Sequence, residues 1–230
     1  MYYAIGDIHG EIDLLLDLYD KIVYDIDVRG ETENTVVFLG DYIDRGHGSI
    51  KVLDFLKNRR DTHSLKHIFI RGNHEYMFME AIENPLSRSD VGFWVNNGGM
   101  AVLKEVGMDW DYFRETFPFQ QYTRWIRNET KFYHETKDYV FVHGGVDVRR
   151  DVCSQMPDYL MWARHMEKGH YRGYKKMVIH GHTSYPKPFV DENRVCVDTS
   201  YHPSKKILTA VVLNNINDGY MGFLQSERVL

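Results

Sequence analysis

Five short polar motifs carry the residue types that bind divalent metal ions, and each follows an apolar run. Gly40 to Gly46, Gly-Asp-Tyr-Ile-Asp-Arg-Gly, comes directly after the β-branched run Thr35 to Leu39. A buried strand that ends in two acids, an arginine and two glycines suits a ligand site, although Gly-Asp also marks ordinary turns. The other four motifs are Gly6-Asp7-Ile8-His9-Gly10, Arg71-Gly72-Asn73-His74-Glu75, His143-Gly144-Gly145 and His180-Gly181-His182-Thr183.

Each of these polar residues also has a purely structural explanation when taken alone. A histidine at a strand end can pack or cap, and an aspartate or asparagine beside a glycine commonly forms a turn. Acids and imidazoles that converge on one edge would, however, be costly to desolvate without a cation. Carboxylate, imidazole and amide oxygen without thiolate suit manganese, iron, nickel or zinc and disfavour a structural zinc site. The candidates are Asp7, His9, Asp41, Asn73, His74, His143, and His180 or His182.

The elements that must position these motifs alternate in the first part of the chain. We predict strands over 1–5, 35–39 and 67–70, and helices over 12–24, 50–56 and 76–81. Three strand–loop–helix units in succession favour a parallel α/β arrangement. Because the polar residues come just after each strand, we expect the first three motifs to meet at one edge of one sheet.

The stretch from Pro85 to Lys137 differs from what precedes it. It lacks strand alternation, contains Trp94, Trp110 and Trp125, and is predicted to be a mostly helical insertion beside the site. The segment Trp94 to Gly99 could shape a substrate surface or could be a turn with a buried indole.

Strand character returns after Asp138. We predict strands over 139–142, 177–179, 195–197, 207–213 and 220–224, with antiparallel hairpins between short connections such as 214–219. This second half is expected to form a mixed sheet packed against the first. Nothing in the sequence resembles a linker, repeat or low-complexity segment, so we expect one domain over residues 1–230.

The composition of the 230-residue chain narrows the classes of partner. A hydrophobic content of 43% is ordinary for a globular domain, and a net charge of −5 argues against a general nucleic-acid binder. No apolar run approaches the roughly 20 residues of a membrane span. Two cysteines, Cys153 and Cys196, and the lack of a signal-peptide pattern predict a reducing, cytoplasmic location.

In this order, the five motifs resemble those of the PPP-type metallophosphoesterases, the superfamily of serine/threonine phosphoprotein phosphatases and diadenosine tetraphosphate hydrolases. The resemblance runs from Gly6 to about Thr199. The chain length, the segment Trp94 to Gly99 and Trp162-Ala163-Arg164 are similar to the small bacterial and bacteriophage phosphatases. The resemblance implies an α/β, calcineurin-like fold in which two mixed β-sheets pack as a sandwich flanked by helices, with the insertion at about 85–137.

The resemblance also implies two divalent metal ions, with manganese expected and iron, zinc or nickel as alternatives. The implied ligands are Asp7 and His9 for the first ion, Asp41 as a bridge between both, and Asn73, His143 and His182 for the second. His180 matches a position outside this ligand set. Two close cations would lower the pKa of a bridging water and supply hydroxide for in-line attack on phosphorus.

Further site residues follow from the same resemblance. Arg45 and Arg164 would hold the phosphate oxygens, with Asn73 beside them, because guanidinium geometry suits a bidentate grip on an anion. His74 would be the general acid and Asp44 its orienting partner. The expected substrate is phosphoserine or phosphothreonine in a protein. The alternative is a small nucleotide such as a dinucleoside polyphosphate. The motifs do not distinguish these two substrates, and they do not indicate an oligomeric state.

One departure from the family pattern lies near the end of the resemblance. Many relatives have Asp-Thr-Gly where this chain has Asp198-Thr199-Ser200. Because the glycine lies outside the ligand set, Ser200 is expected to change local loop geometry only. The run from Tyr201 to Lys206 is also unusual and could alter the rim of the pocket.

Overall fold

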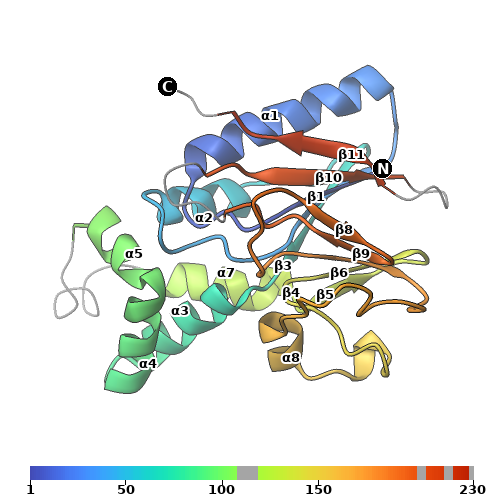
Figure 1. Cartoon of the computed structure of the whole chain (residues 1–230). Helices are drawn as coiled ribbons and strands as arrows, with labels where there is room; N and C mark the ends of the chain where they lie inside the picture. Colours follow the sequence, from blue (N-terminus) through green and yellow to red (C-terminus); the bar gives the residue numbers. More distant parts are fainter. Residues whose placement is uncertain (108–118, 201–205, 215–219, 228–230) are drawn as a thin grey trace.

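Two β-sheets run through the computed structural model, which describes residues 1–107, 119–200, 206–214 and 220–227 (Figure 1). The first sheet has the strand order β11-β10-β1-β2-β3-β4. Its strands are β1 (Tyr2–Ile5), β2 (Asn34–Phe38), β3 (Leu65–Ile70), β4 (Thr130–Lys131), β10 (Thr209–Leu213) and β11 (Tyr220–Gln225). β1 to β3 run parallel to one another, as the alternating pattern predicts. β4, which was not predicted, is parallel to β3, and β10 and β11 pair antiparallel at the other side.

The second sheet has the order β5-β6-β7-β9-β8. Its strands are β5 (Tyr133–Glu135), β6 (Tyr139–Val142), β7 (Met177–His180), β8 (Phe189–Asp191) and β9 (Arg194–Cys196). The three inner strands are parallel and both edge strands are antiparallel. The predicted α/β class with two mixed sheets is therefore confirmed.

Alternate residues of the first sheet face different neighbours, as the period of a strand requires. Ala4 and Val37 point toward the second sheet, where they join a buried cluster with Phe141, Ile179 and Val195. Tyr3, Ile5, Val36 and Phe38 point the other way, into a cluster with the helices. The strands are thus buried on both faces, which explains why they appear in the sequence as continuous apolar runs.

Two strands predicted for the second sheet belong to the first. β10 pairs antiparallel with β1, with Leu213 opposite Tyr2, and β11 extends the sheet beyond it. The sequence prediction followed chain order, whereas β10 is buried on both faces and fits the open side of β1. Residues 215–219 of the predicted connection lie outside the described residues.

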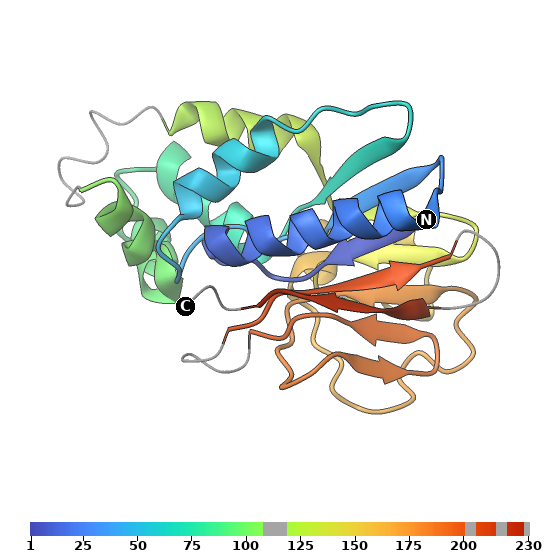
Figure 2. The ribbon, with the colours of Figure 1, turned by 90° about the horizontal axis from the view of Figure 1, so that it is seen from above.

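Three helices follow the first three strands: α1 (Ile12–Arg29), α2 (Ser49–Lys57) and α3 (Asn73–Glu83). Figure 2 shows α1 running along the strands on the outer face of the first sheet. α1 continues beyond the predicted end at Tyr24 and stops at Gly30, whose φ of 67° is the left-handed conformation typical of a helix C-cap. α3 begins within its motif, so Asn73 and His74 lie in its first turn.

The stretch 85–137 contributes α4 (Arg88–Trp94), a π-helical turn (Val95–Gly99), α5 (Met100–Glu105) and α7 (Gln120–Glu129), followed by β4 and β5. These helices gather with α3 at one side of the molecule (Figure 1). Trp110 lies outside the described residues. After β6 the chain forms a short 3-10 helix (Val152–Ser154) and α8 (Pro157–Trp162). Among the described residues, no helix combines the length and apolar character needed to cross a bilayer.

Candidate active site

The five motifs meet at the carboxyl ends of β1, β2, β3, β6 and β7, and their backbone is held in an unusual conformation. Six described residues other than glycine have a left-handed φ. Five of them belong to the motifs: His9, Asp41, Asp44, Arg45 and His182. Such φ values are unfavourable for residues with a side chain and persist only where the surroundings enforce them. Their concentration here marks the loops as built for a site.

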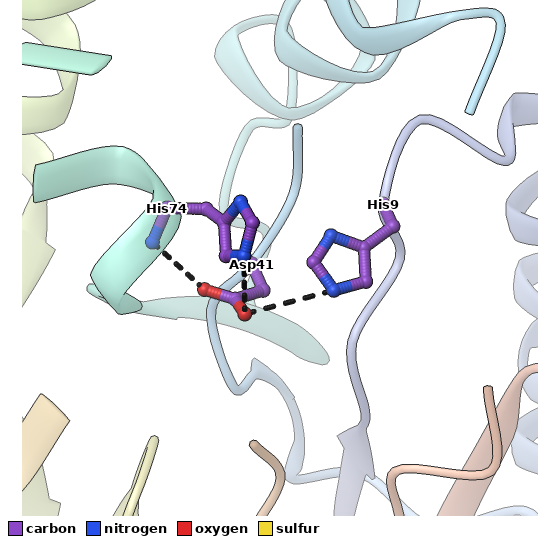
Figure 3. A group of neighbouring side chains, drawn as sticks. All are labelled: His9, Asp41 and His74. Atoms are coloured by element: carbon purple, nitrogen blue, oxygen red, sulfur yellow. Dashed lines mark hydrogen bonds and ion pairs between the residues drawn. The ribbon is translucent and has the colours of Figure 1, made fainter. Parts of the chain in front are cut away.

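Asp41 is the centre of this arrangement, because both of its carboxylate oxygens face imidazole groups. Figure 3 shows one of these oxygens between the rings of His9 and His74. Oδ2 lies 3.7 Å from Nε2 of His9 and 3.8 Å from Nε2 of His74. Oδ1 lies 3.3 Å from Nε2 of His143 and accepts the backbone N–H of His74 at 3.1 Å. One buried carboxylate therefore joins histidines from both sheets.

Two groups of metal-ligating side chains share this carboxylate. The first consists of His9, Asp41 and His74, and the second of Asp41, His143 and His182. Within each group the ligand atoms lie within 4.8 Å of one another, and all five residues are buried. The sharing agrees with the predicted bridging position of Asp41. The first group contains His74, which the sequence prediction assigned to proton transfer.

The remaining predicted ligands, Asp7 and Asn73, adjoin these groups. The carboxylate of Asp7 accepts the backbone N–H of His182 at 3.2 and 3.1 Å, and Oδ1 of Asn73 lies 2.9 Å from Nε2 of His143. Gly181 makes the approach of Asp7 possible, since a Cβ there would collide with the carboxylate. The structure thus brings together all six residues predicted as ligands.

Two of the histidines are oriented by backbone carbonyls. Nδ1 of His9 donates to the carbonyl of Ile43 at 2.9 Å, and Nδ1 of His143 donates to the carbonyl of Leu39 at 2.8 Å. Each bond directs Nε2 toward Asp41 and keeps a proton on Nδ1, so that Nε2 is the nitrogen that would bind a metal ion. Hydrogen bonds of this kind are typical of metal-binding histidines.

The electrostatics of the cluster favour a cation. Burial, and next the carboxylate of Asp198, raise the pKa of Asp7 well above its ordinary value. Burial alone would lower the pKa of His143, yet the carboxylate of Asp41 raises it to about 10. The negative potential that holds a proton on His143 would equally hold a metal ion. Burial lowers the pKa of His182 to about 3, so this imidazole is neutral and able to donate a lone pair. The residues therefore fit divalent cations.

The predicted general acid and its partner form a buried hydrogen-bonded chain. Nδ1 of His74 donates to Oδ2 of Asp44 at 2.7 Å, and the indole N–H of Trp94 donates to Oδ1 of the same carboxylate at 2.9 Å. Burial by itself would lower the pKa of His74, but the carboxylates of Asp41 and Asp44 raise it. The two carboxylates thus favour the protonated form of His74, which is the form that can donate a proton.

Trp94 is a functional neighbour that sequence analysis left undecided. It is fully buried and belongs to α4 in the stretch 85–137, so the buried indole is confirmed. It nevertheless reaches the site through Asp44. The next segment reaches it as well, because the carbonyl of Gly98 accepts the backbone N–H of Arg45 at 3.2 Å. A buried indole at Trp94 is therefore compatible with a substrate surface formed by the segment Trp94 to Gly99.

Both predicted phosphate-binding arginines are exposed at the mouth of the cluster. Arg45 donates to Nε2 of His9 at 2.8 Å and to Nε2 of His74 at 3.1 Å. Arg164 donates to Nε2 of His182 at 3.0 Å. The two guanidinium groups thus contact opposite ligand groups, one on each side of Asp41. Arg71, by contrast, turns away and bonds to Thr130 and the carbonyl of Ile126 at the end of α7.

Glu75 is a site residue that sequence analysis missed. It is fully buried, and its carboxylate accepts the backbone N–H groups of Asp41, Tyr42 and Gly72 at 2.7–3.0 Å. Burial, and next Asp41, raise its pKa to about 7. Glu75 thereby ties the loop after β2 to the loop after β3. Its position three residues after Gly72, at the start of a helix, was the available signal.

Other predicted positions lie around the cluster rather than in it. His180 is buried, and its Nε2 has no hydrogen-bond partner within the described residues, in line with a position outside the ligand groups. Ser200 donates its backbone N–H and its hydroxyl to Asp198 at 3.0 and 2.6 Å. Residues 201–205 lie outside the described residues, and Lys206 pairs with Glu11 at 2.5 Å beside Asp7 and His9.

The family model for calcineurin-like phosphoesterases matches residues 2–205. The symmetrical bis(5'-nucleosyl)-tetraphosphatase of Nitrosospira multiformis is 29% identical over 146 residues, which cover 63% of this chain and 43% of that protein. The catalytic subunit of serine/threonine-protein phosphatase 6 of Caenorhabditis elegans is 33% identical over 97 residues, 39% of this chain and 27% of that protein. The chain thus spans less than half the length of the curated relatives it matches.

A solved structure has a similar fold over the whole chain. A protein serine/threonine phosphatase from Saccharomyces cerevisiae, described as similar to human phosphatase PP5, aligns with a TM-score of 0.61 and 16% identity. The alignment covers 100% of this chain and 80% of that one. At this identity the likeness concerns the fold, and it agrees with the two mixed sheets described above.

Proposed function

The chain belongs to the calcineurin-like phosphoesterase family, and we propose that it is a metal-dependent phosphoester hydrolase that acts on phosphoserine and phosphothreonine in proteins. The observation that carries the proposal is the carboxylate of Asp41, which two groups of potential metal ligands share, with His9 and His74 beside Oδ2 and His143 beside Oδ1. The similarity to the phosphatase 6 catalytic subunit supports the choice of substrate.

In this proposal the two ligand groups hold two divalent ions, with manganese as the proposed metal. The ligands are Asp7, His9, Asp41, Asn73, His143 and His182. Ions held there would polarise the phosphate group and lower the pKa of a bound water, which supplies the nucleophile. The carbonyls of Leu39 and Ile43 keep the imidazoles of His143 and His9 oriented for this task.

The chain's own residues would bind the phosphate and move the proton. Arg45 and Arg164, on opposite sides of Asp41, would hold the phosphate oxygens and offset the charge that develops on them. His74 would protonate the leaving alkoxide, and Asp44 would keep its Nδ1 proton in place. Because His74 and Asp44 are buried, water would not compete for the hydrogen bond between Nδ1 of His74 and Asp44.

A second candidate substrate is a dinucleoside polyphosphate, and one feature of the mouth favours it. Phe93 of α4 and Trp162 of α8 are 53% and 36% exposed, with ring centroids 6.2 Å apart. The Trp162 ring also lies 6.2 Å from that of His182. Exposed aromatic rings beside a phosphate site can stack on a nucleobase. We therefore propose that the stretch 85–137 borders the substrate.

Two further proposals concern the chain as a whole. One is that residues 1–230 act as a single domain, because the stretch 85–137 contributes β4 to the first sheet and β5 to the second. The other is a cytoplasmic location. It is supported by Cys153 and Cys196, whose thiols are both free.

The deciding experiment compares substrates on the Mn²⁺-supplemented chain. A phosphoserine peptide and diadenosine tetraphosphate are offered at matched concentrations, with an aryl phosphate as reference and with chelator as control. We expect peptide dephosphorylation that stops with chelator. Turnover that survives metal removal would contradict the metal-dependent proposal, and hydrolysis of the dinucleotide alone would select the second candidate. In that case Phe93→Ala should lower kcat/KM for the dinucleotide by about 5- to 100-fold and leave the aryl phosphate unchanged.

A further inference from the structure

The turn between β8 and β9 contacts the loop that follows Arg164 through four consecutive residues. Asp191 accepts the backbone N–H of Gly169 at 2.5 Å, and Glu192 accepts from Nε of Arg172 at 2.9 Å. The next residue, Asn193, donates from its amide to the carbonyl of Tyr171 at 3.3 Å. The last, Arg194, donates to the carbonyls of His165 and Glu167. We call these four residues the 191–194 turn.

Arg194 is the buried member of the 191–194 turn. It is 0% exposed and lies between aromatic rings, with its guanidinium carbon 4.5 Å from the ring centroid of Phe189 and 5.6 Å from that of Tyr171. Its nearest carboxylate, Asp191, is 3.6 Å away. Burial of a guanidinium is costly, and an apolar side chain could fill the same space. An apolar side chain could not, however, donate hydrogen bonds to the carbonyls of His165 and Glu167.

Those two carbonyls belong to residues that closely follow Arg164 in the chain. His165 is the next residue and Glu167 is three residues on, so the guanidinium of Arg194 restrains the backbone from which Arg164 extends. A second tie leads back to the site, because the hydroxyl of Tyr171 accepts the backbone N–H of Val146, three residues after His143. Asn193 is also the sixth described non-glycine residue with a left-handed φ, 57°, and the other five belong to the motifs.

We propose that Arg194 is a positioning residue that holds the loop after α8 so that Arg164 points at the phosphate. The inference rests on the proposed role of Arg164 in phosphate binding. Arg194 cannot touch a substrate, since it is fully buried. Its effect on catalysis is therefore indirect. Because its hydrogen bonds go to the loop that follows Arg164, we expect this effect to pass through Arg164, so the two arginines should not be independent.

The test is phosphate binding, measured by calorimetry with inorganic phosphate and the Mn²⁺-loaded chain. Arg194→Met should weaken phosphate binding by about 10- to 100-fold, because a small misplacement of a binding group is enough for such a loss. It should raise KM more than it lowers kcat and leave the bound metal content unchanged. Arg172→Met removes an exposed arginine that meets the same turn, and this matched control should change phosphate affinity less than about twofold.

A double-mutant cycle separates positioning from general loosening of the structure. In an Arg164→Ala background, Arg194→Met should cause little further loss of phosphate affinity, because the group that it positions is gone. An equal loss in both backgrounds would overturn the inference. So would an unchanged phosphate affinity in Arg194→Met alone, or a wild-type chain that binds no phosphate.

A second variant serves if Arg194→Met does not fold. Arg194→Lys keeps the buried charge but lacks the planar fork that reaches two carbonyls, so phosphate affinity should fall by a smaller factor and the metal content should stay the same. Wild-type affinity in this variant would count against the inference. A chain that binds phosphate but cleaves no phosphoester would contradict the proposed function alone, and the affinities would still decide the role of Arg194.

Discussion

The two sheets contribute to the site in different ways. The loops after β1, β2 and β3 are tied directly to one another. His9 bonds the carbonyl of Ile43, Glu75 bonds three backbone N–H groups across two loops, and Asp44 joins His74 to Trp94. The second sheet supplies His143 and His182 at strand ends, but Arg164 lies on a longer loop whose ties come from the 191–194 turn. The difference indicates that the shared carboxylate of Asp41 is held by contacts between neighbouring loops, whereas Arg164, the proposed phosphate ligand, is held by contacts from a distant turn.

The largest expected effect comes from the shared carboxylate. Asp41→Asn should cost both metal ions and reduce turnover by more than the ~10²–10⁴-fold that loss of a general acid causes. His182→Asn, on the side of the second sheet, should cost one ion only. Metal content by elemental analysis, beside kcat, measures both. Two ions retained per chain in Asp41→Asn would contradict the proposal that both ions share this carboxylate.

The next effect concerns the proposed proton transfer, because His74 and Asp44 both follow strands of the first sheet. His74→Asn should lower kcat by about 10²–10⁴-fold for alkyl phosphates and much less for aryl phosphates, whose leaving groups need no proton. Arg164→Ala, which changes a residue from the part of the chain that forms the second sheet, should lower the rates with alkyl and aryl phosphates equally. Rates with the two kinds of ester separate these outcomes. Equal losses for alkyl and aryl esters in His74→Asn would remove His74 from this role.

A smaller effect is expected at Glu75, which ties the loops but belongs to neither of the two ligand groups. Glu75→Gln keeps the size but replaces the carboxylate that accepts three N–H groups, and we expect a loss of about 10–100-fold in metal affinity. Glu80→Gln on the same helix is the matched control. Titration of the apo chain with Mn²⁺ gives the affinities. Wild-type affinity in Glu75→Gln would mean that the loops hold Asp41 without this tie.

The smallest effect belongs to Trp94. Trp94→Phe removes one hydrogen bond to Asp44 and keeps an aromatic ring, so a loss of about 1 kcal/mol, or roughly fivefold in kcat, is expected. The loss should be confined to alkyl phosphates, because it acts through His74. The alkyl-to-aryl rate ratio measures it. A general loss for both esters would indicate altered packing of α4 instead.

Most residues of this site could be predicted from short stretches of sequence. Each motif follows its own strand, and parallel strands bring their carboxyl ends to one edge of a sheet. The sequence therefore predicts that Asp7, Asp41 and Asn73 lie close together at that edge. Sequence analysis could not place β10 beside β1, since strand pairing depends on which buried edge is free. Nor could it separate Trp94 from an ordinary core indole, because the hydrogen bond to Asp44 spans 50 residues of chain.

The sequence by itself indicated which strand ends carry metal-ligating residue types, because that follows from residue type and from the periodicity of a strand or helix. The separate roles expected for the ligands and for the phosphate-binding arginines came from the resemblance of the five motifs to a known family. Only the tertiary structure decided that Glu75 ties two loops, that Trp94 supports Asp44 and that Arg194 holds the loop of Arg164. Those contacts join distant residues, and their energies arise from burial, which no single stretch of sequence specifies.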